Sequence, residues 1–411
     1  MNGGRYTLIK NARLVDPGLN TVRNCSLLFE NAGADGTPSR ILEIGDVRVS
    51  EALAKNLTVY NARSHYVSAG FVDLSTHACE PGNMHKETLK SASLAARAGG
   101  YTAYLTTADT SPAADDPLVV EYVKANGALT KCRALPGALL TKHGSCGELS
   151  PLKELAESGA AAFFADMQSD SSVLVKGMKL CRDNGYPLII RCSDGARAGI
   201  DQDINTARAL LLAAECDCAV HLSCVSRARS IELVRYAKSR GVKVTCDTCP
   251  QYFIFTREDI PWYGSSLCLD PPLGSREDKQ AILEGIADGT VDCISSDHTP
   301  CSQQEKQGRM SECAKGMISL QSTFGASYTY LVSAGVIGLA RLVQMLTEAP
   351  ARVLGMKDHA LKEGSAADIT VFGAPSEQIF TKEMNMSRSE NSPFFGQIFS
   401  ASVIQTFVDG K

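Results

Sequence analysis

The strongest constraint on this chain is a regular alternation of strand-like and helix-like segments that begins near residue 67. Short apolar runs are followed by longer segments, such as SIELVRYAKSRG, in which apolar residues recur at helical spacing. Eight strand-like runs can be counted: GFVDLS, TAYLTT, RALPGALL, AAFFAD, PLIIRC, CAVHLS, KVTCDT and DCISSD. Eight strand–helix units close into a (β/α)8 barrel. The sequence therefore predicts an α/β protein built on a TIM-type barrel.

The two ends of the chain differ from its middle. Residues 1–65 hold short β-like runs between Gly, Asn and Pro turns, and short strands return after about residue 360 with ADITVFG and SASVIQTFVDG. We expect both ends to form one small β-sandwich domain from residues 1–65 and 359–411, beside a barrel of residues 66–358. The polar stretch 301–316 has no clear period and is predicted to be a surface loop.

Composition excludes several classes of function. The net charge is −4 and no basic run is present, so a nucleic-acid partner is not expected. No apolar run reaches the roughly 18 residues of a membrane span, and no signal pattern begins the chain, so we expect a cytoplasmic protein. The fifteen cysteines are scattered, which argues against a disulfide framework. The pair Cys246 and Cys249 has CxxC spacing, which leaves packing or redox and metal chemistry open.

In a (β/α)8 barrel the chemistry lies where strands end and the following loops begin. Polar and charged residues do occupy these places in the sequence. The candidates are Ser75, His77, Asp109, Asp166, Arg191, Cys224, Asp247, Asp297 and His298.

Several segments, in order, resemble dihydroorotases, a branch of the amidohydrolase superfamily. FVDLSTHACEPG resembles the strand-one motif of that family, which has His-x-His followed by Arg. GALLTKHGSCGEL, HLSCVSRARSIELV, DPPLGSREDKQAI, LTEAPARVLGM and ENSPFFG resemble later segments, so the resemblance runs through nearly the whole chain. It implies the barrel fold, hydrolysis of a cyclic amide in pyrimidine biosynthesis, and zinc that activates a bound water.

When the metal ligands of the family are matched to this sequence residue by residue, few of them are kept. The resemblance matches His77 to the second strand-one histidine, and Asp297 to the strand-eight aspartate that moves the proton. Ser75, Arg191 and Cys224 stand where the family has histidines at strands one, five and six. A neutral hydroxyl is a poor zinc ligand, and a guanidinium cannot bind a metal at all. Asp297 is therefore interpreted as a remnant of the catalytic group.

The strand-four carboxylate and the substrate contacts differ as well. The metal carboxylate falls on Ala165, and Asp166, one place later, is expected to point to the opposite face of the strand. The family's strand-one arginine, which would hold the carboxylate of the substrate, is absent here, so binding of an anionic substrate is disfavoured. The family's substrate-binding positions are occupied by Cys79, Asp109, Asp270 and Cys301.

The remaining polar residues have simpler interpretations. Arg191 could pair with Asp297 or Asp166 and so prevent an unpaired buried charge. We expect Cys224 to be a buried thiol and His221 a core residue. His298 is expected to be a loop histidine whose side chain leaves the old ligand cluster.

Three functions stay open. The favoured one is a non-catalytic, cofactor-free, oligomeric subunit that acts as a structural or regulatory partner of aspartate carbamoyltransferase, with exposed loop charges such as Glu305 and Lys306 influencing assembly. The second is an active dihydroorotase, or related cyclic amidohydrolase, with a rebuilt zinc site of His77, Cys224 and Asp297. The third is a small-molecule-binding protein that uses the emptied barrel site.

Overall fold

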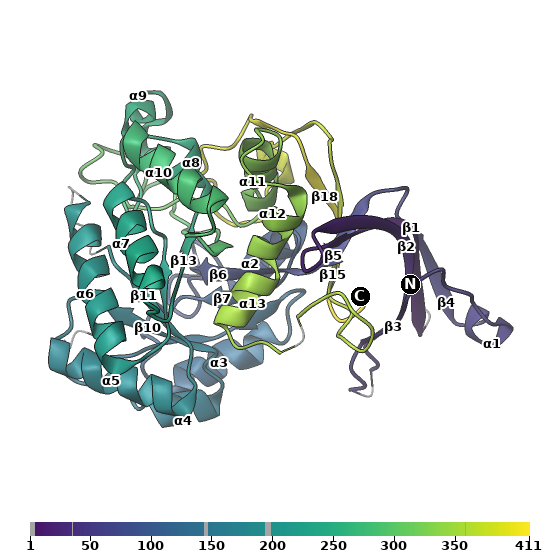
Figure 1. Ribbon diagram of the computed structural model, residues 1–411, viewed down its shortest axis with the longest axis horizontal. Helices are drawn as coiled ribbons and strands as arrows, with labels where there is room; N and C mark the ends of the chain where they lie inside the picture. Colours follow the sequence, from purple (N-terminus) through teal and green to yellow (C-terminus); the bar gives the residue numbers. More distant parts are fainter. Residues whose placement is uncertain (1–4, 35, 144–146, 194–198, 358) are drawn as a thin grey trace.

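The computed structural model describes residues 5–34, 36–143, 147–193, 199–357 and 359–411. Part of the GALLTKHGSCGEL segment and the expected barrel end at residue 358 lie outside these described residues. Figure 1 shows a barrel surrounded by helices on one side and a smaller sheet, which carries both ends of the chain, on the other.

The barrel is built from parallel strands, as predicted. Neighbouring strands pair in chain order from the first to the third position and again from the third to the eighth. The third position holds two short strands separated by Pro136, which lacks the N–H that a continuous ladder needs. The strands are β6 (Phe71–Thr76), β7 (Tyr101–Thr106), β8 (Arg133–Leu135), β9 (Gly137–Leu139), β10 (Ala162–Asp166), β11 (Leu188–Arg191), β12 (Val220–Ser223), β13 (Val244–Thr248) and β14 (Cys293–Ile294).

Helices follow the strands and cover the outside of the barrel (Figure 1). Their buried faces carry the apolar residues whose spacing predicted them, as in α7, where Ile231, Val234 and Ala237 are buried. The longer helices are α2 (Leu89–Ala98), α3 (Pro117–Gly127), α4 (Leu152–Ser158), α5 (Ser171–Asn184), α6 (Ile200–Cys216), α7 (Ala228–Ser239), α10 (Arg276–Ala287), α12 (Leu339–Leu346) and α13 (Glu348–Val353). Short ones are α1 (Glu51–Ala54), α8 (Pro250–Ile254), α9 (Ile260–Tyr263) and α11 (Thr323–Ser327), with single turns η1 (Arg257–Asp259), η2 (Gly264–Leu267), η3 (Tyr328–Val332) and η4 (Lys382–Met384).

A seven-stranded sheet unites the two ends of the chain. Its order is β18-β15-β5-β1-β2-β3, and β4 also pairs with β1. A bulge between Ile9 and Ala12 bends β1, so its first half pairs with β4 and its second half with β5. The sheet therefore curls around its own apolar cluster, which includes Phe29, Val67 and Ile369. The strands are β1 (Tyr6–Asp16), β2 (Thr21–Glu30), β3 (Arg40–Gly45), β4 (Leu57–Asn61), β5 (Tyr66–Ala69), β15 (Ile369–Gly373) and β18 (Ser402–Phe407), and β16 (Gln378–Ile379) pairs separately with β17 (Ile398–Phe399).

Polar contacts join this sheet to the barrel. Arg133, which begins β8, donates to Asp409 (Nη1 to Oδ1, 3.0 Å) and forms a second ion pair with Asp368. His359 Nε2 lies 2.7 Å from the backbone carbonyl oxygen of Gly70. The exact domain limits stay a prediction; β5, just after residue 65, is a strand of the small sheet.

The polar stretch 301–316 is a loop without helix or strand, as predicted. Its charges, however, are not free at the surface. Glu305 Oε1 pairs with Lys86 Nζ at 2.7 Å. Lys306 Nζ donates to the backbone carbonyls of Ser265, Cys268 and Ala314 at 3.0, 3.1 and 2.8 Å. Both side chains are half-buried and hold the loop in place, so they are not the exposed charges that were expected; their influence on assembly stays a prediction.

No helix among the described residues is both long and apolar enough to cross a membrane.

Candidate functional site

The carboxyl ends of the barrel strands surround a cavity of about 300 Å³. The structure brings to its walls three of the residues expected at the strand ends and three more that occupy the family's substrate-binding positions. His77, Cys79, Asp109, Arg191, Asp270 and Cys301 all line it. Asp297 and Cys224 are buried beside it, within reach of the Arg191 side chain.

The centre of this site is an ion pair between Arg191 and Asp297. Arg191 ends β11 and reaches across the barrel mouth, where its Nη1 donates to Asp297 Oδ1 at 2.9 Å. The Asp297 side chain is only 5% exposed, while that of Arg191 is 27% exposed. Burial disfavours the charged guanidinium, but Asp297 and the other groups around it together outweigh burial and hold the pKa of Arg191 well above its ordinary value. A permanent cation thus compensates the buried carboxylate.

Further donors surround the same carboxylate. Gln251 Nε2 donates to Asp297 Oδ2 at 3.3 Å, and the Ser75 hydroxyl lies 3.5 Å from Asp297 Oδ1. Arg191 itself also donates to the backbone carbonyl of Asp270. Gln251 was not among the candidates from sequence, because it lies on the short helix α8 after the strand end rather than in the strand motif. With both oxygens accepting hydrogen bonds, Asp297 is held in place as an acceptor.

Cys224 is a buried thiol, as expected, and it contacts Arg191 and Cys249. Its Sγ lies 3.7 Å from Arg191 Nη1 and 3.6 Å from Cys249 Sγ. The Cys249 thiol favours the Cys224 thiolate, but burial and neighbouring carboxylates outweigh this and raise the pKa of Cys224. Cys246, the other cysteine of the CxxC pair, turns away and donates to the carbonyl of Thr290. Cys249 therefore has Cys224 as its thiol neighbour rather than Cys246.

At the strand-four position the structure differs from the expectation based on sequence. Asp166 stands opposite Arg191 in the β10–β11 ladder, so the two residues share one face of the sheet, and the expectation that Asp166 points away is wrong. Its carboxylate is nevertheless exposed and accepts a bond from the backbone N–H of Gln168 at 2.8 Å. Ala165, in contrast, is buried in the main apolar cluster. Of the two partners considered for Arg191, the structure selects Asp297.

A second charged pair joins His77 to Asp109. His77 Nδ1 lies 2.7 Å from Asp109 Oδ2, and the Thr107 hydroxyl donates to the other Asp109 oxygen at 2.5 Å. Burial opposes the charged form of the ring, but Asp109 outweighs it and raises the pKa of His77. Burial likewise opposes ionisation of Asp109, and the imidazolium outweighs it and lowers the pKa of that carboxyl. The pair therefore favours an imidazolium over the neutral ring that binds metals.

The two thiols of the cavity wall, those of Cys79 and Cys301, are not activated as nucleophiles. Burial raises the pKa of Cys79 to about 12, and burial also raises the pKa of Cys301. Asp270 Oδ1 accepts a bond from the Ser193 hydroxyl at 2.6 Å. A thiol with a raised pKa carries little thiolate at neutral pH and is a weak nucleophile.

The two other histidines of the strand ends are structural. His221 is a core residue, as expected, and bonds to Asp247 and Thr245. The side chain of His298 does leave the ligand cluster, but it is 1% exposed rather than a loop histidine at the surface. Its Nε2 lies 3.2 Å from Glu87 Oε2, and its Nδ1 accepts the backbone N–H of Ser319 at 3.2 Å.

The family resemblance implies zinc, and the residues at the inherited positions do not fit it. A guanidinium lies between Cys224 and Asp297, two of the three proposed ligands, and the third, His77, is paired with Asp109. Within the described residues, one other group could hold a metal ion: Cys224, Asp247 and Cys249, whose ligand atoms lie within 4.8 Å of one another.

That second group also fits a metal poorly. Metals bind the thiolate, and burial raises the pKa of Cys249 well above its ordinary value. Asp247 already accepts bonds from His221 Nε2, the Cys224 N–H and the Ser295 hydroxyl.

We expect the Arg191→Met variant to lose about 3 kcal/mol of unfolding free energy, because it leaves the buried Asp297 without a cation. Adding Asp297→Asn should restore much of this loss, which urea unfolding of the two single variants and the double variant would measure. Arg229→Met, which removes an exposed pair with Glu232, is the control and should change stability by less than about 1 kcal/mol. Additive effects of the two site substitutions would contradict the importance of the pair.

We expect the pKa of His77 to lie above its ordinary value in the unmodified protein and to fall in Asp109→Asn, where burial and Arg191 still oppose the charged ring and the strongest stabilising neighbour is lost. Histidine NMR signals followed through a pH titration would show this. The stabilisation from the pair is complete below the unfolded His pKa of about 6.5 and above the unfolded Asp pKa of about 3.9. It is lost as pH rises through the folded His77 pKa, so the stability difference between the two proteins should shrink from pH 5.5 to pH 8.5. A constant difference would count against the charged pair.

Comparisons with known proteins agree with this fold. The amidohydrolase family profile matches residues 66–411. The dihydroorotase of Aquifex aeolicus is 32% identical over 98% of both chains, and that of Bacillus subtilis is 32% identical over 95% of this chain and 97% of the other. The L-hydantoinase (dihydropyrimidinase) of Arthrobacter aurescens shares the fold, with a TM-score of 0.87 at 21% identity over 98% of this chain and 95% of that one. The chain therefore belongs to the amidohydrolase family and is dihydroorotase-like along almost its whole length.

Proposed function

We propose that this chain is a dihydroorotase-like protein of pyrimidine biosynthesis that does not itself catalyse hydrolysis and acts as a structural or regulatory subunit. The observation that carries this proposal is the Arg191–Asp297 ion pair. The resemblance places metal ligands at both positions, and here they neutralise each other. The assignment to this pathway is supported by the likeness to relatives named dihydroorotase.

Hydrolysis of a cyclic amide needs an activated water and a group that moves its proton. Asp297 would be that group, but its oxygens accept hydrogen bonds from Arg191 and Gln251. The position of the arginine that would hold a substrate carboxylate is Cys79, a neutral thiol. The proposal therefore rests on a carboxylate that is already paired and on a neutral thiol at the family's carboxylate-binding position, although the cations Arg191, Lys86 and Lys315 also line the cavity.

We expect the purified protein to contain far less than one zinc ion per chain and to show no dihydroorotase turnover above background, because hydroxyl, methyl and guanidinium groups replace ligands. Elemental analysis together with a dihydroorotate hydrolysis and cyclisation assay would measure both. A matched variant, Ser75→His/Arg191→His/Cys224→His, restores histidine at the three positions where the family has it and should gain zinc. Stoichiometric zinc that resists chelators in the unmodified protein, with turnover that Asp297→Ala abolishes, would favour the rebuilt catalytic site instead.

The partner is proposed to be aspartate carbamoyltransferase, the enzyme that makes carbamoyl-aspartate, which a dihydroorotase cyclises. A barrel without catalytic use still offers large outer helical faces, and the interface would lie there or on the loops. The inherited site would then take no part in assembly.

We therefore expect a stable complex with co-expressed aspartate carbamoyltransferase, unchanged by Asp297→Asn or His77→Ala. Size-exclusion chromatography with light scattering would detect it. Charge reversal at exposed Lys153 on α4 or Arg229 on α7 samples two outer faces without breaking buried contacts. Two separate peaks at micromolar concentration would exclude the complex and leave small-molecule binding in the 300 Å³ cavity as the function to pursue.

A further inference from the structure

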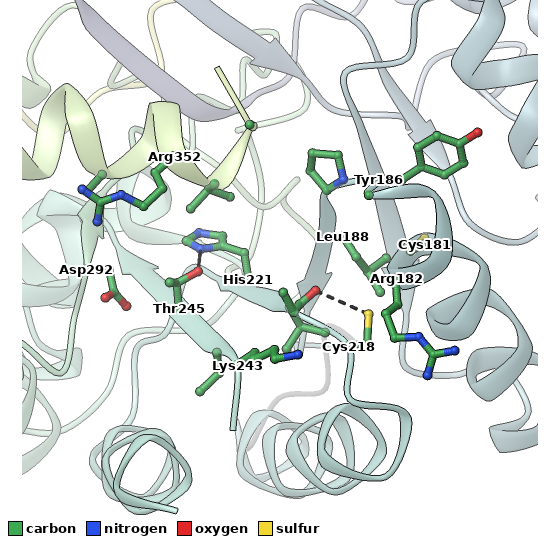
Figure 2. A pocket seen from close by; sticks show the side chains of 18 of the residues that line it. Cys181, Arg182, Tyr186, Leu188, Cys218, His221, Lys243, Thr245, Asp292 and Arg352 are labelled. Carbon is green, nitrogen blue, oxygen red and sulfur yellow. Dashed lines mark hydrogen bonds between the residues drawn. The ribbon is translucent and has the colours of Figure 1, made fainter. Parts of the chain in front are cut away.

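A larger cavity, of about 710 Å³, lies at the opposite end of the barrel from the inherited site. It opens where β11, β12 and β13 begin, and α12 and α13 contribute to its wall. Figure 2 shows Arg352 and Asp292 on one side of this cavity, Arg182 and Tyr186 on the other, and His221 with Thr245 between them. Small-molecule sites typically have volumes of about 300–1,000 Å³, so this cavity is large enough for a ligand.

The floor of the cavity is polar and fixed. His221, which is 2% exposed, places Nε2 at 2.9 Å from Asp247 Oδ2 and Nδ1 at 2.8 Å from Thr245 Oγ1. When His221 Nε2–H donates to Asp247, Nδ1 accepts a hydrogen bond from the Thr245 hydroxyl. The Thr245 oxygen then keeps lone pairs that can accept a hydrogen bond from a ligand.

The cavity wall carries more positive than negative groups. Its cations are Arg182, Lys243, Arg341 and Arg352, and its carboxylates are Asp217 and Asp292. Most of these already have partners of opposite charge: Lys243 pairs with Asp217 at 2.7 Å, Arg182 with Asp183 at 2.7 Å, and Asp292 with Lys238 at 2.7 Å.

Two arginines have no carboxylate partner within ion-pair distance in the described part of the chain. Arg341 donates to the Val291 carbonyl at 2.9 Å and to Gln344 Oε1 at 2.7 Å, both neutral acceptors. Arg352, on α13, forms no ion pair with a described residue; its charge acts on Glu348 one turn earlier only from beyond that distance. Guanidinium groups bind carboxylate and phosphate through two parallel hydrogen bonds.

Apolar side chains complete the wall. Leu188, Val242, Ala349 and Val353 line the cavity together with the ring of Tyr186. A ligand with an apolar or aromatic body would bury that body against them, and the same ligand would place a negative group near Arg341 and Arg352.

We propose that this cavity is a binding site for a small organic anion that combines an apolar or aromatic body with a terminal phosphate or carboxylate. The anionic group would bind Arg352 and Arg341, and the body would pack toward Tyr186 and Val242. The site lies at the amino ends of the strands and shares no lining residue with the inherited site. A test of this binding site is therefore independent of the function proposed for the inherited site.

Isothermal titration with phenyl phosphate tests this site in the full chain. Inorganic phosphate supplies the anion alone, phenol the ring alone, and benzoate replaces phosphate by carboxylate. We expect phenyl phosphate or benzoate to bind saturably, and more tightly than inorganic phosphate or phenol does. Arg352→Gln should weaken it about ten-fold or more, as expected when a charged partner is lost, while Arg229→Gln on α7 should leave it unchanged.

A second variant fills the cavity without touching a charge. Ala219 lies on the exposed rim of the cavity, so Ala219→Phe should block binding while the protein stays folded. Hydrogen exchange should show ligand protection in residues 242–245 and 349–355 of the unmodified protein only. No saturable binding of either aromatic anion, or binding that survives both Arg352→Gln and Ala219→Phe, would overturn the proposal.

Discussion

The structure depends on the seam that closes the barrel between its first and last strands. Asp73 of β6 is fully buried and accepts hydrogen bonds from the Ser296 N–H at 2.6 Å, the Ser296 hydroxyl at 2.9 Å and the Thr76 hydroxyl at 2.5 Å. Burial raises the pKa of Asp73 to about 6. Because a buried carboxylate without partners is costly, these bonds determine how β6 meets the segment after β14. Thr76 and His298 complete the seam as a parallel bridge.

This seam also positions the inherited site. Ser75 lies on the same strand as Asp73, His77 directly follows the end of that strand, and Asp297 follows Ser296 on the other side, so closing the barrel brings all three to its mouth. A buried carboxylate at that point needs a positive charge nearby. Arg191 supplies it from β11 and pairs with Asp297 at the mouth of the barrel.

The two ends of the barrel differ in how their charges are satisfied. At the carboxyl ends of the strands, the cations Arg191 and His77 are each paired with a carboxylate. At the amino ends, Arg341 and Arg352 face a larger cavity without a carboxylate partner among the described residues. Charge that a protein leaves uncompensated beside a cavity is available to a ligand, and for this reason we propose the amino-terminal cavity as the anion site.

The sequence by itself determined the barrel, the small sheet built from both chain ends, and the strand-end positions of His77, Arg191 and Asp297. Those features follow from local patterns, since the spacing of apolar residues depends only on near neighbours in the chain. Only the tertiary structure decided which groups meet. Arg191 and Asp297 are 106 residues apart, and Asp166 was an equal candidate until its carboxylate was seen to turn to Gln168. The contact of Cys224 with Cys249, the buried bonds of Lys306 and the cavity beside Arg352 likewise join segments distant in the chain. Such contacts depend on how helices and strands pack in space, which a local pattern does not encode.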